Sequence, residues 1–392
     1  MIRRMSGIIV KSFFLCLLAV LTSCWRDNPT ELTKLPARHT ENSLDSSQAW
    51  EVFKRARYYP NGTELSICIV KGDSDKYIGV ERRNDSLVYI ENSDSVFEIG
   101  SITKTFTGTM LAKLVYEGKV RLEDPIKDYL PLPLHQSSLN GEEVRLVHLA
   151  NHTSGLPFEP ANVREGKGHA FDPYSPYKQY STEDLHEYLS HEMVLTSTPG
   201  ERRLYSNLGG GLLGYILTCV TKKTYEELLS ESICAPLRMQ NTFVELTPQR
   251  ARRMVQGRDQ NGRPLPMGGG DCGALTGCGG IKSSAQDLSK YIRANMRDTT
   301  YFDLAQKTTK QFDEHLTGGL GWATYSENGM HHVGAFGATG GYTCGVIFER
   351  SRRVGIVLLT NVSAFLPSKE SNAEGLCRAL YDPLVSADPG RN

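Results

Sequence analysis

Ser101 and Lys104 are the residues of this sequence whose types and spacing most clearly point to chemistry. They are three positions apart at the start of a segment with helical periodicity, so both side chains project from one helix face. A free serine is a poor nucleophile, and a lysine amine at this spacing supplies a base within hydrogen-bond reach. Tyr205 and Asn207 follow much later in the chain. The pattern indicates covalent acyl transfer by Ser101, with a tyrosine brought in from elsewhere in the fold.

A second Ser-x-x-Lys pattern occurs at Ser175 and Lys178. Proline follows this serine directly, and the surrounding stretch is rich in turn-forming and aromatic residues without a helical face. We interpret the second pattern as a chance match.

The elements that must position Ser101 can be predicted from periodicity. Ile102, Phe106, Met110 and Leu114 recur at a spacing of four, which predicts a helix that ends near Gly118. β-Prone runs and helical runs elsewhere predict strands at 65–70, 77–80, 343–348 and 354–359, helices at 144–150, 212–220, 225–233 and 373–380, and a long surface loop at 162–180. Strands at both ends with helices between them predict one sheet built from distant segments, with a helical insert.

Composition excludes some classes of function. The 392 residues include 44 basic and 44 acidic side chains, so the formal charge is zero and no basic surplus favours nucleic-acid binding. Charged residues make up 22% and hydrophobic residues 39%, which is ordinary for a globular protein. We expect no nucleic-acid partner and leave the oligomeric state open.

The N-terminus has the pattern of an export signal. Arg3 and Arg4 precede an apolar run at 13–21 that is shorter than the roughly 20 residues of a membrane span, so we predict a cleaved signal peptide over 1–23. Leu21-Thr22-Ser23-Cys24 resembles a bacterial lipobox, which predicts lipidation of Cys24 and membrane anchoring in the periplasm or at the cell surface. The alternative is a plain secretory signal with a chance cysteine. We expect a polar tether at 24–47 and one folded domain at 48–385.

Several further segments resemble a known family, and they occur in its order. The segments are 97–104 (Phe-Glu-Ile-Gly-Ser-Ile-Thr-Lys), 148–157 (His-Leu-Ala-Asn-His-Thr-Ser-Gly-Leu-Pro), 204–207 (Leu-Tyr-Ser-Asn), 235–239 (Ala-Pro-Leu-Arg-Met), 279–288 and 339–342 (Thr-Gly-Gly-Tyr). From about residue 62 to about 380 the chain resembles the serine β-lactamase and penicillin-binding-protein superfamily, nearest the class C β-lactamases, D-aminopeptidases and related esterases. Arg238 stands where that family has glycine.

The resemblance implies a fold and a set of roles. The fold is α+β and β-lactamase/transpeptidase-like, an antiparallel sheet flanked by helices with a mostly helical subdomain at about 119–290. Ser101 is implied as the acylated nucleophile, Lys104 and Tyr205 as proton-transfer groups, and Asn207 as a hydrogen-bond partner of the substrate amide. The backbone N–H groups of Ser101 and Ala338 form the implied oxyanion hole, and Thr339 is implied as a further substrate-binding residue. No cofactor and no metal are expected.

One segment departs from the family pattern. A gapless alignment through Thr339 places Ala335 where the family has lysine or histidine, and Ala335 has no charge to bind a substrate carboxylate. We therefore expect uncharged esters, or D-amino-acid amides without a free carboxylate, to be better substrates than β-lactams. His332 is a candidate substitute if the strand is bulged, and an arginine from elsewhere is another. His331 and His332 can also be a surface pair.

Other features have simpler interpretations. His148 and His152 are four apart, but no glutamate lies where a zinc protease needs it, so we do not read them as metal ligands. Gly209, Gly210 and Gly211 are expected to serve packing at a helix start, because no Lys-Ser or Lys-Thr follows them. We expect Lys282 to be solvated. Cys272 and Cys278 either bridge in an oxidising compartment or remain separate thiols.

The sequence thus predicts a metal-independent serine hydrolase that works through an acyl-enzyme on an amide or ester. Peptides ending in D-amino acids, as in peptidoglycan, small esters and β-lactams are all compatible substrates. The alternative is a membrane-tethered binding or sensory protein that has the fold without turnover, and the presence of Ser101, Lys104, Tyr205 and Asn207 favours the enzyme.

Overall fold

The computed structural model describes residues 32–34, 43–164, 171–297, 300–327, 330–366 and 373–386. The predicted signal peptide at 1–23 and Cys24 lie outside the described residues, so both stay predictions. The end of the predicted tether belongs to the folded region, because Leu32 and Leu44 are buried there and helix α1 begins at Ser46 with Asp45 as its N-cap.

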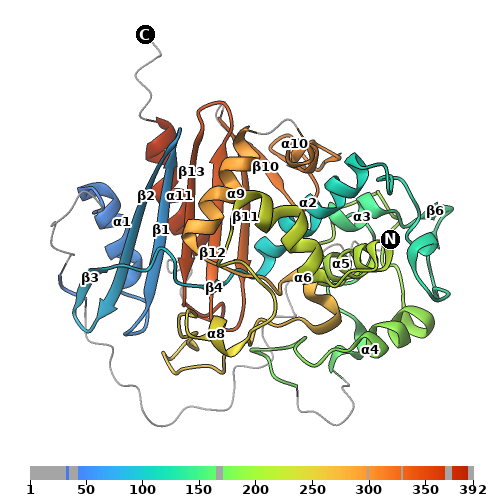
Figure 1. Cartoon of the computed structure of the whole chain (residues 1–392), viewed down its shortest axis with the longest axis horizontal. Coiled ribbons are helices and arrows are strands. Elements are labelled where there is room, and N and C mark those ends of the chain that lie inside the picture. Colours follow the sequence, from blue (N-terminus) through green and yellow to red (C-terminus); the bar gives the residue numbers. More distant parts are fainter. Residues whose placement is uncertain are drawn as a thin grey trace, which may run out of the picture. The chain divides into compact units, whose positions relative to one another are not determined.

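A nine-stranded antiparallel sheet forms the body of the described region, in the order β3-β2-β1-β13-β12-β11-β10-β9-β8 (Figure 1). Its strands are β1 (Glu64–Lys71), β2 (Ser74–Arg83), β3 (Ser86–Ile90), β8 (Lys310–Gln311), β9 (Leu316–Gly318), β10 (Ala323–Glu327), β11 (Met330–Ala338), β12 (Thr343–Glu349) and β13 (Val354–Thr360). β1 pairs with β13, so Leu65 lies opposite Thr360 from the far end of the chain. This confirms the predicted α+β fold with one sheet built from distant segments.

Most of the helices and two short ribbons occupy the sequence between β3 and β8. The helices of the described region are α1 (Ser46–Ala56), α2 (Thr103–Tyr116), α3 (Leu146–Ala150), α4 (Thr182–Glu187), α5 (Asn207–Thr221), α6 (Tyr225–Leu229), α7 (Ala235–Leu237), α8 (Pro248–Ala251), α9 (Ala285–Arg297), α10 (Tyr301–Gln306) and α11 (Ala373–Ser386), with 3₁₀ turns η1 (Gly100–Ile102), η2 (Ile126–Tyr129), η3 (Ala161–Arg164) and η6 (Gly273–Cys278) and π-helical turns η4 (Tyr188–Glu192) and η5 (Ser230–Cys234). The ribbons pair β4 (Phe97–Glu98) with β7 (Lys282–Ser283), and β5 (Ser138–Leu139) with β6 (Glu142–Glu143).

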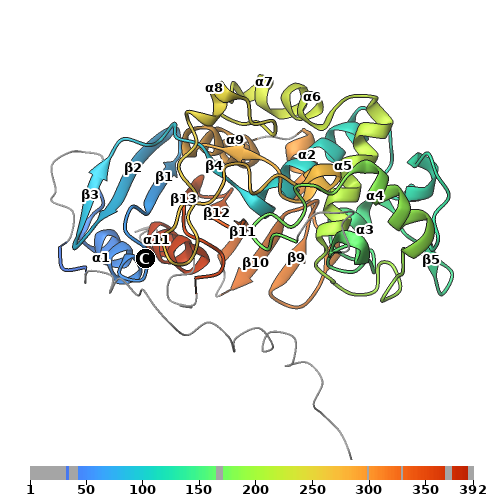
Figure 2. The same ribbon diagram turned by 90° about the horizontal axis from the view of Figure 1, so that it is seen from below.

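Helices cover both faces of the sheet. Successive side chains of a strand point to opposite faces, so neighbouring residues of one strand pack against different helices. Ile67 and Ile356 belong to a buried cluster with α1 and α11, whereas their neighbours Cys68 and Val357 belong to the larger cluster on the other face. Figure 2 shows α1 and α11 on one side of the sheet and α9 on the other. α9 starts inside the range predicted as the helical subdomain, yet it packs on β1 and β13.

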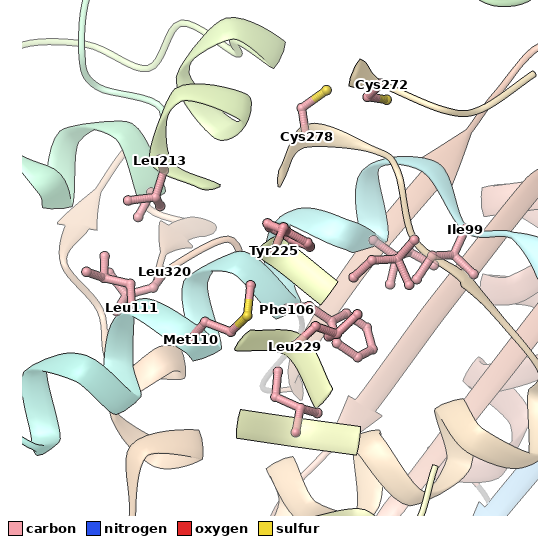
Figure 3. Close-up of a cluster of buried hydrophobic side chains, with 14 of the residues drawn as sticks. Ile99, Phe106, Met110, Leu111, Leu213, Tyr225, Leu229, Cys272, Cys278 and Leu320 are labelled. Carbon is pink, nitrogen blue, oxygen red and sulfur yellow. The ribbon is translucent and has the colours of Figure 1, made fainter. Parts of the chain in front are cut away.

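Helix α2 runs through the core of the helical region. Nearly every residue of α2 is buried, and Phe106 stacks on Tyr291 of α9 with ring centroids 3.9 Å apart. Figure 3 shows Phe106, Met110 and Leu111 of α2 among side chains of α5, α6 and the η6 segment. The buried helix α2 holds the position of Ser101, which belongs to the turn η1 immediately before this helix.

One expectation about a surface position is wrong. Lys282 is not solvated: its side chain is fully buried, pairs with Asp271, and donates to the carbonyl of Val244 at 2.8 Å. A charged group is tolerated inside because an opposite charge and carbonyl acceptors surround it. The segment predicted as a surface loop is largely exposed or half-buried from residue 171 to 180, but its Tyr177 and Tyr180 are buried in the larger core cluster.

Candidate active site

Ser101 lies where the helical region meets the sheet. It belongs to η1 and packs against β11, and glycines on both sides make this approach possible. A Cβ on Gly100, where φ is +48°, would lie 2.6 Å from the nitrogen of Ala338, and a Cβ on Gly337 would lie 3.0 Å from the nitrogen of Ser101. Glycine has no Cβ, so the backbones of Ser101 and Ala338 come close together.

The hydroxyl of Ser101 has two candidate bases within hydrogen-bond distance. The Nζ of Lys104 lies 3.0 Å from Ser101 Oγ, and the hydroxyl of Tyr205 donates to the same atom at 2.5 Å. The structure therefore brings together the serine, lysine and tyrosine that the sequence singles out. Such convergence on one hydroxyl is the arrangement that activates a serine nucleophile.

Lys104 is held by three acceptors. Besides Ser101, its Nζ donates to Asn207 Oδ1 at 2.8 Å and to the carbonyl of Cys278 at 2.7 Å, and the side chain is 5% exposed. An ammonium has three donors, so these partners use all of its hydrogen-bonding capacity. Gly210 of α5 leaves room for the chain, because a Cβ there would lie 3.1 Å from Lys104 Cε. This confirms that glycine at 210 serves packing at the start of α5.

Tyr205 and Asn207 are positioned by the start of α5. Ser206 is the N-cap of this helix, and its hydroxyl accepts from the N–H of Gly209 at 2.8 Å and donates to the carbonyl of Pro157 at 2.6 Å. The N–H of Asn207 donates to the carbonyl of Phe158 at 2.8 Å. The segment 204–207 is thereby tied to the segment 148–157, which resembles the same family.

His152 supports Tyr205 from inside the protein. Its ring lies 4.4 Å from the Tyr205 ring, centroid to centroid, and its Nδ1 accepts the backbone N–H of Ser206 at 3.3 Å. Burial, then the charges of Lys104 and Arg203, hold the pKa of His152 well below its usual range. A neutral imidazole can accept this hydrogen bond at Nδ1, which fits the lowered pKa.

We expect His152 to lower the free energy of unfolding at acidic pH. The unfolded imidazole takes up a proton near pH 6.5, while the folded one stays neutral, so its contribution is complete above pH 6.5 and falls by up to about 1.4 kcal/mol per pH unit below it. His152 has φ +63°, which asparagine tolerates, so His152→Asn is the variant of choice. Urea unfolding at about pH 7.5 and about pH 5.5 should show a smaller loss for His152→Asn than for wild type. His191→Asn, at an exposed site, is the control, and equal losses in all three proteins would refute the assignment.

Two hollows flank Ser101, and Ser101, Tyr205 and Phe336 line both. The first, called here the lysine-side cavity, has a volume of about 180 Å³ and is also lined by Lys104, His152, Arg203, Trp322 and Ala335, among others. The second, called the Phe158 cavity, has a volume of about 310 Å³ and is also lined by Phe158, Asn207, Ala338 and Glu374, among others. Substrate groups on the two sides of Ser101 thus meet different surroundings.

Two predicted site residues point elsewhere. The hydroxyl of Thr339 donates to the buried carboxyl of Glu98 at 2.8 Å, and burial raises the pKa of this carboxyl. His332 lies away from the cavities: its Nε2 is 3.0 Å from Nη1 of Arg378 in α11, and its ring stacks on Tyr325. β11 pairs residue by residue with β10 and β12, so no bulge turns His332 toward Ser101. The suggested replacement of the missing charge by His332 is therefore wrong.

Two groups at the site escaped the sequence reasoning. The carbonyl of Cys278 accepts from Lys104, but a backbone acceptor leaves no side-chain signal in the sequence. Tyr177 accepts from Nδ2 of Asn207 at 3.2 Å and donates to Glu159 at 3.2 Å, although it lies in the Ser175-x-x-Lys178 stretch interpreted as chance. Lys178 itself donates to the carbonyl of Met267, away from Ser101.

Within the described ranges no group of three His, Cys, Asp or Glu side chains is arranged to hold a metal ion. No helix in these same ranges is both long and apolar enough to cross a membrane.

Cys272 and Cys278 are free thiols, buried side by side at the edge of the core cluster in Figure 3.

Comparisons with known proteins agree with this geometry. The β-lactamase family model matches residues 73–376. A β-lactamase of Pseudomonas fluorescens is 26% identical over 340 residues, which span 76% of this chain and 88% of that protein. The D-alanyl-D-alanine-carboxypeptidase/endopeptidase AmpH of Escherichia coli K12 is 32% identical over 249 residues, which span 62% of this chain and 60% of AmpH.

Solved structures show the same fold. A β-lactamase/D-alanine carboxypeptidase from Yersinia pestis superposes with a TM-score of 0.70 at 22% identity, covering 85% of this chain and 95% of the other. An octameric penicillin-binding protein homologue from Pyrococcus abyssi gives 0.69 at 24% identity, covering 88% and 78%. Because the family model matches most of this chain, the chain belongs to the β-lactamase family, within the serine β-lactamase and penicillin-binding-protein superfamily, and is a serine hydrolase.

Proposed function

We propose that this chain hydrolyses an amide or ester through an acyl-enzyme formed on Ser101. The observation that carries the proposal is the convergence of Lys104 Nζ and the Tyr205 hydroxyl on Ser101 Oγ, at 3.0 and 2.5 Å. Lys104 is buried and fully hydrogen-bonded, so its position is fixed before a substrate arrives. Pre-positioned groups of this kind lower the cost of orienting the reacting atoms.

In the proposed acylation, the Lys104–Tyr205 pair first gives up one proton to solvent. Tyr205 then takes the Ser101 proton as Oγ attacks the scissile carbonyl carbon. The N–H groups of Ser101 and Ala338, brought close by Gly100 and Gly337, stabilise the negative charge on the carbonyl oxygen. The tetrahedral intermediate collapses, the bond to the leaving group breaks, and Tyr205 returns the proton to that group. Water then attacks the acyl-enzyme and gives one proton to the same pair. The pair passes this proton to Ser101 Oγ as the bond to the acyl group breaks and the acid is released.

The substrate class follows from the acyl chemistry and the relatives. Peptides ending in D-amino acids, as in peptidoglycan, small esters and β-lactams all present a carbonyl that a serine can attack. Relatives of the chain are named β-lactamase and D-alanyl-D-alanine-carboxypeptidase/endopeptidase, which supports β-lactam or peptide substrates. Asn207 lines the Phe158 cavity, and in the proposal it donates to the amide of the acyl part.

The test is covalent labelling. Wild-type protein is incubated with a fluorescent penicillin and, separately, with a fluorescent phosphonate, and the labelled peptide is identified by mass spectrometry. We expect label on Ser101 and the same labelling in Ser175→Ala, which removes the serine of the other Ser-x-x-Lys pattern. Label absent from Ser101 with both probes would instead favour a binding or sensory protein without turnover.

We also propose that the enzyme is exported and held on a membrane surface through a lipid on Cys24. The support is the sequence Leu21-Thr22-Ser23-Cys24 after an apolar run. Two or more acyl chains give stable attachment, whereas one gives marginal binding.

Cys24→Ser is expected to release the protein from membranes or leave it unprocessed, because it removes the thiol that the lipid would modify. The measurement is fractionation of cells that produce the wild type and the variant, with Cys219→Ser as a control for loss of a cysteine elsewhere. Unchanged membrane attachment of mature Cys24→Ser would exclude this anchor.

A further inference from the structure

The lysine-side cavity has an unbalanced charge. Two cations line it, Lys104 and Arg203, and no described lining residue is acidic. The Lys104 amine is already held by Ser101, Asn207 and the carbonyl of Cys278. These partners use all three N–H donors of Lys104, so Arg203 is the cation of this cavity whose donors can be offered to a ligand.

Arg203 is available to a ligand. Its guanidinium lies 5.4 Å from the centroid of the Phe312 ring, and within the described ranges no ion pair joins it to an acidic side chain. Its side chain is exposed at the cavity that Ser101 also lines. Its charge also acts on the buried His152. Burial and the charge of Lys104 are the larger causes of the lowered pKa of His152, and the charge of Arg203 adds to them. A guanidinium can donate two parallel hydrogen bonds to a carboxylate.

The cavity has room for a small group with an apolar body. Phe312, Trp322 and Phe336 supply aromatic walls, and the small side chain of Ala335 leaves the space of about 180 Å³ open beside Ser101. A few polar groups among apolar walls are typical of sites for small ligands.

The proposed reaction assigns the two hollows to different parts of the substrate. Asn207 and Ala338, which meet the acyl amide and the carbonyl oxygen in the proposed mechanism, line the Phe158 cavity. The acyl part therefore occupies that side, and the leaving group extends from the carbonyl carbon toward the lysine-side cavity. Tyr205 lines both hollows and is placed to return a proton to the leaving group.

We propose that Arg203 binds a carboxylate on the leaving group, so that the preferred substrates release a small acid such as an α-amino or α-hydroxy acid. The inference rests on the proposed function and names its substrate class. It also reverses the expectation drawn from Ala335, because the charge missing at that position is supplied across the same cavity by Arg203.

The experiment compares two thioesters with the same acyl group, one leaving as mercaptoacetate and the other as its methyl ester. Release of the thiol is followed for both, and the readout is the ratio of their kcat/KM values. We expect wild type to prefer the charged thioester by about 10- to 100-fold, the range of a charge-assisted hydrogen bond. Arg203→Ala should bring the ratio close to one, and Arg203→Lys should retain part of the preference because it keeps the charge but not the fork of donors.

Arg202→Ala is the matched control, because this neighbouring arginine is exposed and donates to the carbonyl of Thr196 instead of lining the cavity. It should keep the wild-type ratio. A wild-type ratio near one, an unchanged ratio in Arg203→Ala, or an equal loss on both thioesters would overturn the assignment while the proposed hydrolase stands. No turnover of either thioester together with no probe on Ser101 would overturn the proposed function, and the inference with it.

Discussion

Ser101→Ala is expected to abolish the acyl-enzyme and to lower turnover by on the order of 10⁴- to 10⁶-fold, as removal of a serine nucleophile does in well-studied hydrolases. The Oγ of Ser101 is the atom on which Lys104 and Tyr205 converge, and neither neighbour replaces it as the attacking group. Alanine is compatible with the short turn η1 that precedes α2, so the fold should be kept.

The measurements for Ser101→Ala are mass spectrometry of the protein after incubation with a penicillin or phosphonate, steady-state hydrolysis of a thioester, and thermal unfolding. Ser175→Ala serves as the control and should behave as wild type in all three. Substantial turnover in a folded Ser101→Ala protein would rule out the serine mechanism and require another nucleophile.

Local signals in the sequence predicted much of the fold. The β-branched run in β1, and the turn-forming residues before β2, leave few alternatives to a strand pair. The spacing of Ser101 and Lys104 defines their relation, because both lie on consecutive turns of one helical segment. Periodicity carries this information within a single element.

Relations between distant elements carry weaker signals. The sequence around Lys282 does not indicate that Asp271 and the carbonyl of Val244 are its partners, so it predicts a solvated side chain. His332 faces α11 because the regular pairing of β11 sets the alternation of its side chains. Arg203 is one of two adjacent arginines, and the structure shows which of the two lines the cavity.

One departure from the family pattern has a backbone explanation. Arg238 stands where the family has glycine, and it adopts φ +54° at the end of α7. Glycine adopts this left-handed conformation without steric strain, which explains why the family has glycine at this position. Arginine keeps the turn, at the expense of some strain.

Lys104→Ala and Tyr205→Phe are each expected to slow acylation by about 10²- to 10⁴-fold, the range for a positioned acid–base group. Tyr205→Phe is the cleaner change, since it removes the hydroxyl that donates to Ser101 and keeps the ring against His152. Lys104→Ala also leaves Asn207 Oδ1 and the carbonyl of Cys278 without their shared donor, so its stability must be measured alongside its rate.

Stopped-flow acylation by a fluorescent penicillin separates these roles, because it follows formation of the acyl-enzyme before hydrolysis. Lys113→Ala, on the same helix but paired with Glu117 at the surface, and Tyr174→Phe, whose hydroxyl donates to Gln260, are the matched controls. Both controls should acylate at the wild-type rate. A slow Tyr205→Phe beside a fast Lys104→Ala would assign the proton transfer to the tyrosine alone. Wild-type rates in both would show that the proton of Ser101 leaves by a route that uses neither group.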